Sequence, residues 1–273
     1  MSFDLSWQLV LELLLLGSVS GFLAGMLGIG GGMLMVPFLT LLLTHKHFPS
    51  DLVIKMAVAT SLATICFTSI ASVRAHQARG AVRWDVVKLL APGIVVGGLI
   101  GAQIAKAMPT AVVAVLFAAF IGFSATQMLL NKKPTATREL PQGAGMFGAG
   151  GLIGLLSSLV GAGGAFISVP FMIWCNLPMH NAVGTSAALG FPIALAGTLG
   201  YVIAGWSMHD LPPGALGFLY LPALVVISVA SMSTARWGAS VAHRMDMAQL
   251  RRMFALLLYA LAAWMLWNAN KGS

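Results

Sequence analysis

Long apolar runs separated by short polar connections dominate the chain. They predict ten helical segments at approximately 7–27, 29–44, 52–74, 86–107, 111–130, 143–160, 165–178, 182–205, 214–236 and 250–268. Many of these runs approach the ~20 apolar residues that a helix needs to cross a bilayer. The pattern therefore predicts an all-α, multi-pass membrane protein in which residues 1–273 form a single membrane domain.

Two glycine-rich stretches interrupt this pattern. GMLGIGGGMLMVPF at residues 25–38 and SLVGAGGAFISVPF at residues 158–171 place clustered glycines and a closing Val-Pro-Phe inside apolar surroundings. Non-helical backbone at membrane depth is tolerated only where protein buries it or where it lines a polar cavity, because an unpaired N–H in lipid is costly. Each break therefore indicates a site inside the protein.

The two stretches belong to a longer internal repeat. The matching positions are Gly28, Gly30, Gly31 and Pro37 with Gly161, Gly163, Gly164 and Pro170, and AVATS at 57–61 with AVGTS at 182–186. We expect two repeats of five helical segments each, over about 7–130 and 143–268.

The basic residues indicate the orientation of the chain. The net charge is +8, and Lys and Arg lie mainly in short connections after the third, fifth and ninth segments. This distribution is the positive-inside pattern and not a nucleic-acid footprint. The connection GWSMHDLPPG at 205–214 has no Lys or Arg, although its counterpart in the first repeat is basic. We therefore expect inverted repeats, with both termini extracytoplasmic and the loops 74–85 and 236–250 cytoplasmic.

The length of the segment at 165–178 bears on how the breaks are built. It makes about 21 Å of helix, short of the ~30 Å hydrocarbon core. Charge leaves full spans and re-entrant hairpins both open, whereas length favours half-helices whose glycine turns meet near the midplane. Inverted repeats with broken helices are typical of secondary transporters, in which half-helix N-termini point at anionic substrate groups. The candidate backbone sites are Gly30, Gly31 and Gly32 in the first repeat, and Gly163, Gly164 and Ala165 in the second.

Polar side chains at repeated positions extend this candidate site. Thr60-Ser61 and Thr185-Ser186 follow the two glycine breaks and could donate hydroxyl hydrogens to an anion, or bond to their own helices.

Three ionisable residues add further hypotheses. Lys55 and His180, each five residues before a Thr-Ser pair, could offer positive charge or extend to the membrane interface. Glu12 is the carboxylate placed well inside an apolar run, which makes it the candidate for proton coupling, although it also lies near the start of the first segment.

The motifs in combination resemble the TauE/SafE sulfite exporter family, also called the 4-toluene sulfonate uptake permease family. The resemblance rests on GMLGIGGGMLMVPF, VATSL, GLLSSLVGAGGAFISVPF and AVGTSAALGFPIALAGTLGY and covers nearly the whole chain. It implies a bacterial inner-membrane carrier of sulfite, organosulfonates and related sulfur anions, with export as the leading direction. One departure is Ala165, where the first repeat has Gly32.

Other functions remain as alternatives to the carrier. An anion channel and an importer of another small anion stay open on sequence grounds. An intramembrane enzyme is not expected, because Cys66 and His76 are about ten residues, or ~15 Å, apart along one helix. The expected partners are a small sulfur anion, the lipid bilayer and protons as coupling ion, with no nucleic acid, no cofactor and no metal. The oligomeric state is open, a homodimer included.

Overall fold

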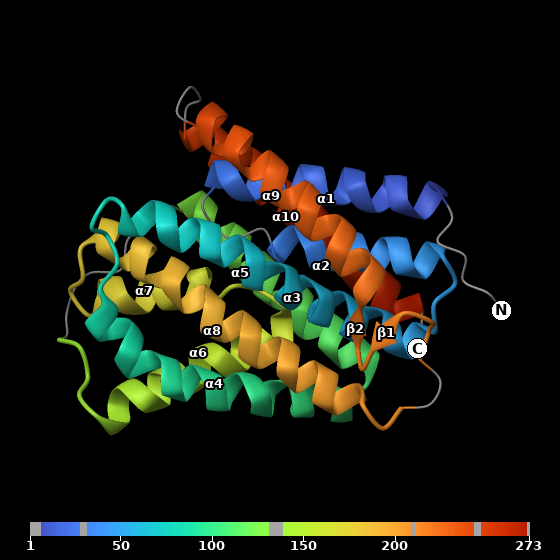
Figure 1. The fold of residues 1–273 in the computed structure, drawn as a ribbon, viewed down its shortest axis with the longest axis horizontal. Coiled ribbons are helices and arrows are strands. Elements are labelled where there is room, and N and C mark those ends of the chain that lie inside the picture. Colours follow the sequence, from blue (N-terminus) through green and yellow to red (C-terminus); the bar gives the residue numbers. More distant parts are fainter. Residues whose placement is uncertain (1–6, 28–31, 131–138, 209–210, 243–246, 272–273) are drawn as a thin grey trace.

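The computed structural model describes residues 7–27, 32–130, 139–208, 211–242 and 247–271. These residues form ten helices and one two-stranded ribbon (Figure 1). The elements are α1 (Trp7–Leu27), α2 (Gly32–His45), α3 (Ser50–Gln77), α4 (Trp84–Ala107), α5 (Thr110–Leu130), α6 (Ala144–Val160), α7 (Ala165–Trp174), α8 (Met179–Gly205), β1 (Ala215–Leu216), β2 (Leu219–Tyr220), α9 (Leu221–Ala242) and α10 (Met247–Lys271).

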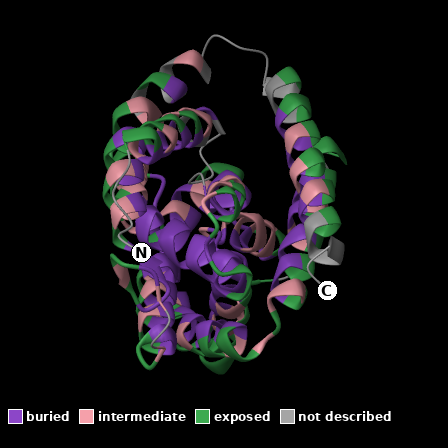
Figure 2. Cartoon of the chain, turned by 90° about the vertical axis from the view of Figure 1, so that its right-hand side faces the viewer, coloured by how far each residue is buried: buried purple, intermediate pink, exposed green. Residues whose placement is uncertain are grey.

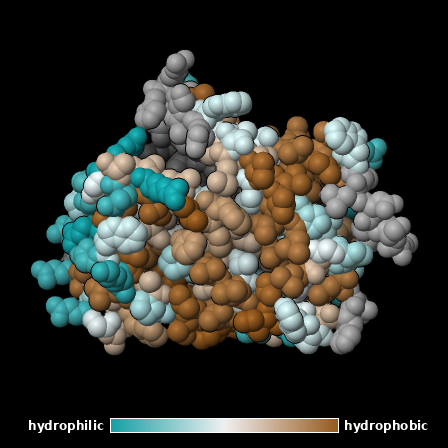
Figure 3. Space-filling model, in the orientation of Figure 1, coloured by the Kyte–Doolittle hydropathy of each residue, from teal (hydrophilic) through white to brown (hydrophobic). Residues whose placement is uncertain are grey.

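Helix length and surface hydropathy agree with a protein that spans a membrane. Among the described helices, α3, α4, α5 and α8 are long and apolar enough to cross a bilayer, while α2, α6 and α7 are shorter apolar helices. Hydrophobic side chains cover the middle of the face shown in Figure 3, and hydrophilic side chains gather at its left end. The all-α expectation is therefore confirmed, apart from the short ribbon.

One end of the bundle carries several arginines. Helix α3 ends and α4 begins at the left end of Figure 1, where Arg74, Arg79 and Arg83 lie close together in the chain. We call this the basic end. Helix α3 begins and α4 ends at the right-hand end, called the opposite end, where α1 also begins and α10 also ends (Figure 1).

Helices α3 and α8 form the centre of the molecule. They pack against each other, α3 also contacts α2 and α9, and α8 also contacts α4 and α7. Buried residues concentrate in the interior helices, and exposed residues lie on the periphery (Figure 2). The hydroxyls of Thr60, Ser61 and Thr185 are among the completely buried polar groups. The centre of the bundle therefore combines tight packing with a set of neutral polar side chains.

Two parallel helix pairs flank this centre. Helix α4 runs alongside α6, with Gly97 against Gly151, and α1 runs alongside α9, with Gly21 against Ser231. At both positions an added Cβ would collide with the backbone of the facing helix, so glycine allows the close approach. The α4–α6 pair and the α1–α9 pair are thus both held close together by glycines at their contact.

One expected helical segment was partly wrong. The apolar run at 214–236 does not begin as a helix: residues 215–220 form the antiparallel ribbon β1–β2, and α9 starts at Leu221 and continues to Ala242. Gly214 and Gly217 have φ values of +81° and +57°, which a right-handed helix does not contain. A short apolar run does not by itself distinguish a strand from a helix.

The ribbon is anchored by aromatic side chains. The ring of Phe218 meets Tyr201 of α8 edge to face with centroids 6.1 Å apart, and Tyr220 meets Phe48 at 5.3 Å. Phe218 and Tyr220 are buried. The ribbon therefore forms part of the core at the opposite end of the bundle.

Candidate functional site

A four-residue turn separates α6 from α7. Helix α6 ends at Val160, Gly161 follows with φ +68°, and Gly164 has φ +74° directly before the first residue of α7, Ala165. Glycine adopts this left-handed region at little cost, whereas other residues rarely do. The sequence GAGG therefore lets the chain reverse between two apolar helices within a few residues.

Ser61 on α3 joins this turn to the start of α2. Its hydroxyl lies 3.1 Å from the carbonyl oxygen of Gly161 and 3.4 Å from that of Gly32, and it donates toward them. Gly32 is the last glycine of the first stretch and the first residue of α2, and a Cβ added to it would lie 2.8 Å from the Gly161 oxygen. The described part of the first break and the second break therefore meet at the buried Ser61.

Further hydroxyl groups surround the start of α7. Ser168 and Ser186 share a hydrogen bond of 2.8 Å between their oxygens. The Ser157 hydroxyl is fully buried, has no hydrogen-bond partner among the described residues, and lies 3.0 Å from the position that a Cβ on Gly164 would occupy. An unpaired buried hydroxyl is costly, so such a group points to a missing partner.

The first turn of α7 adds backbone donors. The amides of Ile167 and Ser168 donate to the carbonyl oxygen of Gly164, whereas those of Ala165 and Phe166 have no backbone acceptor among the described residues. Free amides and a positive dipole end are the usual properties of a helix N-terminus. Together with Ser157, they make the region beside Gly164 suitable for an acceptor or an anion.

Thr60 and Thr185 take part in two equivalent hydrogen bonds. The Thr60 hydroxyl accepts the amide of Tyr220, the residue before α9, and the Thr185 hydroxyl accepts the amide of Arg83, the residue before α4. Both therefore cap the start of a neighbouring helix. Each of the two hydroxyls is directed toward the residue before a neighbouring helix.

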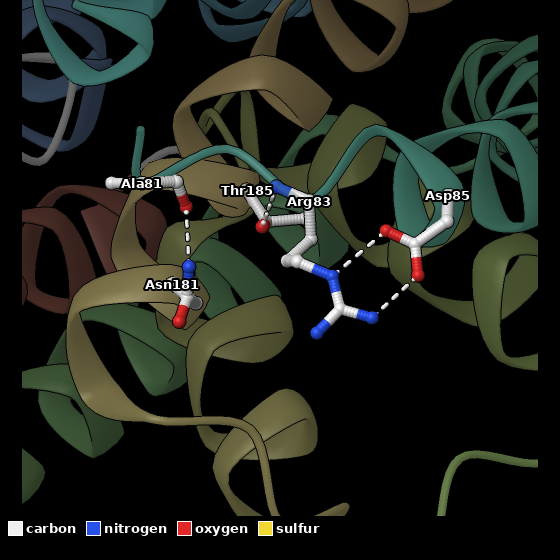
Figure 4. Close-up of polar contacts among 5 residues, drawn as sticks. All are labelled: Ala81, Arg83, Asp85, Asn181 and Thr185. Carbon is white, nitrogen blue, oxygen red and sulfur yellow. Dashed lines mark hydrogen bonds and ion pairs between the residues drawn. The ribbon is translucent and has the colours of Figure 1, made fainter. Parts of the chain in front are cut away.

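Figure 4 shows the second of these contacts at the basic end. The Asn181 amide donates to the carbonyl oxygen of Ala81 at 3.2 Å, next to the bond from Arg83 to Thr185. The Arg83 side chain forms two hydrogen bonds with Asp85, which raise the pKa of the guanidinium. The loop before α4 is thus held onto the first two turns of α8.

The three ionisable candidates do not meet at the glycine turns. Lys55 is buried and donates to the carbonyl oxygen of Lys106 at 3.1 Å, near the start of α3, while His180 is exposed at the start of α8. Glu12 pairs with Lys46 at 3.1 Å, and it precedes the end of α1 by roughly 22 Å of helix. The described centre is therefore formed by neutral groups. Gly30 and Gly31 lie outside the described residues.

Sequence reasoning missed Ser157 and Ser168. Both flank the second glycine turn, but the matching positions in the first repeat are Ala24 and Met35, 133 residues earlier. A search for features present in both repeats passes over groups that only one repeat carries. Ser157 lies one helical turn before GAGG and Ser168 one turn after it, and this position could have marked them as candidates.

Apolar spans and a helical bundle define a multi-pass membrane protein, and its buried polar centre is the candidate site. Comparison with known proteins agrees: the family model described as "Sulfite exporter TauE/SafE" matches residues 13–265. The chain belongs to this family, and it is a membrane transporter.

Relatives with similar lengths carry the same general description. A probable membrane transporter protein of Haemophilus influenzae is 35% identical over 93% of this chain and 96% of its own length. A probable membrane transporter protein of Methanocaldococcus jannaschii is 24% identical over 96% of this chain and 98% of its own. The Bacillus subtilis protein YdhB, also a probable membrane transporter, is 28% identical over 89% and 93%. No solved structure shows significant similarity to the chain.

Proposed function

We propose that the protein is a secondary transporter that exports a sulfur oxyanion, sulfite or an organosulfonate, and binds it beside the glycine turns at Ser61. The observation that carries this proposal is the buried contact of Ser61 with Gly32 and Gly161, next to Ser157, whose hydroxyl has no partner in the described part of the chain. The family description supports the substrate class and the direction.

An inverted-repeat architecture with re-entrant hairpins completes the proposal. Helix α6 begins at the basic end beside α4, and α7 leads back to the start of α8 at the same end. Helix α1 begins at the opposite end, and α2 leads back to the start of α3 there (Figure 1). The ten residues of α7 make about 15 Å of helix, half of a hydrocarbon core. We infer that one hairpin enters from each side and that their turns meet inside the membrane.

The chemistry beside Gly164 suits an anion that must also leave. Each hydrogen bond to a charged group contributes about 1.5–3 kcal/mol, and a partly buried helix N-terminus contributes up to ~2 kcal/mol. The Ser157 hydroxyl and the amides of Ala165 and Phe166 could together offset the desolvation of an oxyanion. No Lys or Arg is needed at the centre, so the anion is not held in a permanent ion pair.

Flux and binding measurements with the purified protein test this function. In proteoliposomes we expect saturable transport of sulfite or an organosulfonate, in preference to sulfate and thiosulfate. Ser157→Ala should weaken binding of the transported anion by about tenfold or more, since it removes a donor to a charged group. Ser158→Ala is the matched control, because the Ser158 hydroxyl already donates to the carbonyl of Leu155. Equal affinities of the two variants would argue against the site.

The main alternative is an anion channel. A channel requires a continuous aqueous pore, whereas the two breaks meet at a buried, tightly packed serine. Single-channel currents that correspond to ion fluxes far above the turnover rate of a carrier would refute the carrier and show a channel. Uptake that accumulates the anion inside the cell would support a carrier that works as an importer and not as an exporter.

A further inference from the structure

The two equivalent threonine contacts set the register between the halves of the molecule. Thr60 and Thr185 are 125 positions apart (185 − 60), and their partners Arg83 and Tyr220 are 137 positions apart (220 − 83). Each position of α3 can therefore be compared with the position of α8 that lies 125 residues later, and each position of α4 with that of α9 that lies 137 later. This register shows where the two halves differ.

A cavity lies between α3 and α9 toward the basic end. It has a volume of about 330 Å³ and is lined by Thr68, Ala71, Met232, Ser233 and Ala235. A volume of this size holds on the order of ten water molecules at ~30 Å³ each. The opening is therefore large enough for a small hydrated anion.

The walls of the cavity suit passage better than binding. The hydroxyl of Thr68 donates to the carbonyl oxygen of Ile65, and that of Ser233 donates to the carbonyl of Val229. These two hydroxyls are polar groups in a mostly apolar wall, and their hydrogens are already used within their own helices. An anion in the cavity would be solvated by water and would not be held by the wall.

The equivalent region between α8 and α4 is closed. Ala71 and Ala235 correspond to Ala196 and Gly98, and there a Cβ added to Gly98 would lie only 3.0 Å from the Ala196 Cβ. Thr68 corresponds to Ile193, which is completely buried. Three of the five positions that line the opening thus have packed counterparts toward the opposite end, whereas Met232 and Ser233 correspond to Val95 and Val96 on the exposed outer face of α4.

One stripe of α3 leads from the cavity toward the buried middle of the helix. Thr60 and Thr64 are fully buried, Thr68 one turn later is half-buried, and Ala71 is exposed. These residues recur at i, i+4, i+8 and i+11 and so share one face of the helix. This face therefore runs from Thr60, the residue before Ser61, to the cavity.

We propose that the α3–α9 cavity is the passage by which the transported anion reaches its site from the basic end, and that the α4–α8 seam is the equivalent gate to the opposite end. The structure is then the state that is open to the basic end. During transport the α3–α9 cavity closes while the α4–α8 seam opens, and the reverse change restores the first state. This inference rests on the proposed transport function, but accessibility can be measured without any substrate.

The matched alanines provide the test. In a variant that carries Cys66→Ala and Cys175→Ala, the substitutions Ala71→Cys and Ala196→Cys are introduced one at a time. A charged, membrane-impermeant maleimide is applied to right-side-out and inside-out vesicles. We expect Ala71→Cys to react from the face that carries Arg79, and Ala196→Cys to resist the reagent from both faces. Reaction of Ala71→Cys only with a membrane-permeant maleimide would place the opening in lipid and overturn the proposal.

A wedge in the closed seam gives a second readout. Gly98→Leu adds a side chain where even a Cβ is tightly placed, so it should separate α4 from α8 and disfavour the closed seam. Labelling of Ala196→Cys from the face opposite Arg79 should then rise by about tenfold, which corresponds to a shift of ~1.4 kcal/mol in the seam equilibrium. Unchanged labelling of Ala196→Cys in folded Gly98→Leu protein would contradict a gate at this seam. If the protein binds no sulfur anion but the cysteines are labelled as expected, the proposed function is refuted and the proposed opening is not.

Discussion

The substitution Gly164→Ala places a methyl group directly in the proposed site. A Cβ at this position would collide with the Ile193 side chain and lie 3.0 Å from the Ser157 hydroxyl. Gly80 offers a matched control, because its φ of +64° is close to the +74° of Gly164 and an added Cβ would meet no atom within 4 Å. Gly164→Ala and Gly80→Ala therefore share the backbone strain and differ in what the methyl group touches.

The expected magnitudes separate the two effects. A non-glycine residue in the left-handed region costs about 1–2 kcal/mol, and both variants should lose this much stability. Gly164→Ala should also displace Ser157 or crowd the approach of an anion to the backbone. Losing one hydrogen bond to a charged group costs about 1.5–3 kcal/mol, which corresponds to roughly 10–100-fold weaker binding.

Two measurements on purified, folded protein decide the outcome. Thermal unfolding in detergent reports the shared loss of stability, and titration calorimetry with sulfite or an organosulfonate reports affinity. We expect Gly80→Ala to bind as the unmodified protein does and Gly164→Ala to bind at least tenfold more weakly. If Gly164→Ala is folded and binds normally, the anion does not occupy this turn, and the reasoning from its geometry is wrong.

Three further predictions address coupling, topology and the ribbon. Glu12→Gln should abolish transport driven by a pH gradient and leave anion exchange intact, because it removes the carboxylate that pairs with Lys46; undiminished gradient-driven flux in proteoliposomes would remove Glu12 as the proton carrier. Arg79→Cys, in the cysteine-free variant, should react with an impermeant maleimide from the cytoplasmic side, and reaction only from outside would contradict the inverted topology. Phe218→Ala should lower the free energy of unfolding by about 3–5 kcal/mol, since it empties a buried aromatic position against Tyr201; a change below ~1 kcal/mol in denaturant unfolding would show that the ribbon is not part of the core.

Much of the helical bundle could be predicted from the sequence because each span needs a long apolar run. The break between α6 and α7 was predictable for a related reason: GAGG supplies glycines at 161 and 164, where the backbone has positive φ. The ribbon at 215–220 was not predicted, since its apolar residues continue directly into those of α9. Its glycines at 214 and 217 were the local signal against a continuous helix.

The contacts of the candidate side chains could be predicted only in part, and their role in binding an anion stays a prediction. Ser61 was a candidate because it follows the first glycine stretch, and the structure shows its hydroxyl donating toward Gly161 and Gly32. Thr60 and Thr185 instead accept helix-start amides, an interaction that depends on the distant residues Tyr220 and Arg83. Sequence spacing within one helix does not reveal such partners, because they come from elements more than 100 residues away in the chain.

The most direct test of the central claim is a structure of the protein with a bound organosulfonate. The account predicts sulfonate oxygens within hydrogen-bond distance, about 3.5 Å or less, of the Ser157 hydroxyl and the backbone amides at the start of α7. A sulfonate bound instead at an end of the bundle, beside Lys55 or His180, would contradict the proposed site.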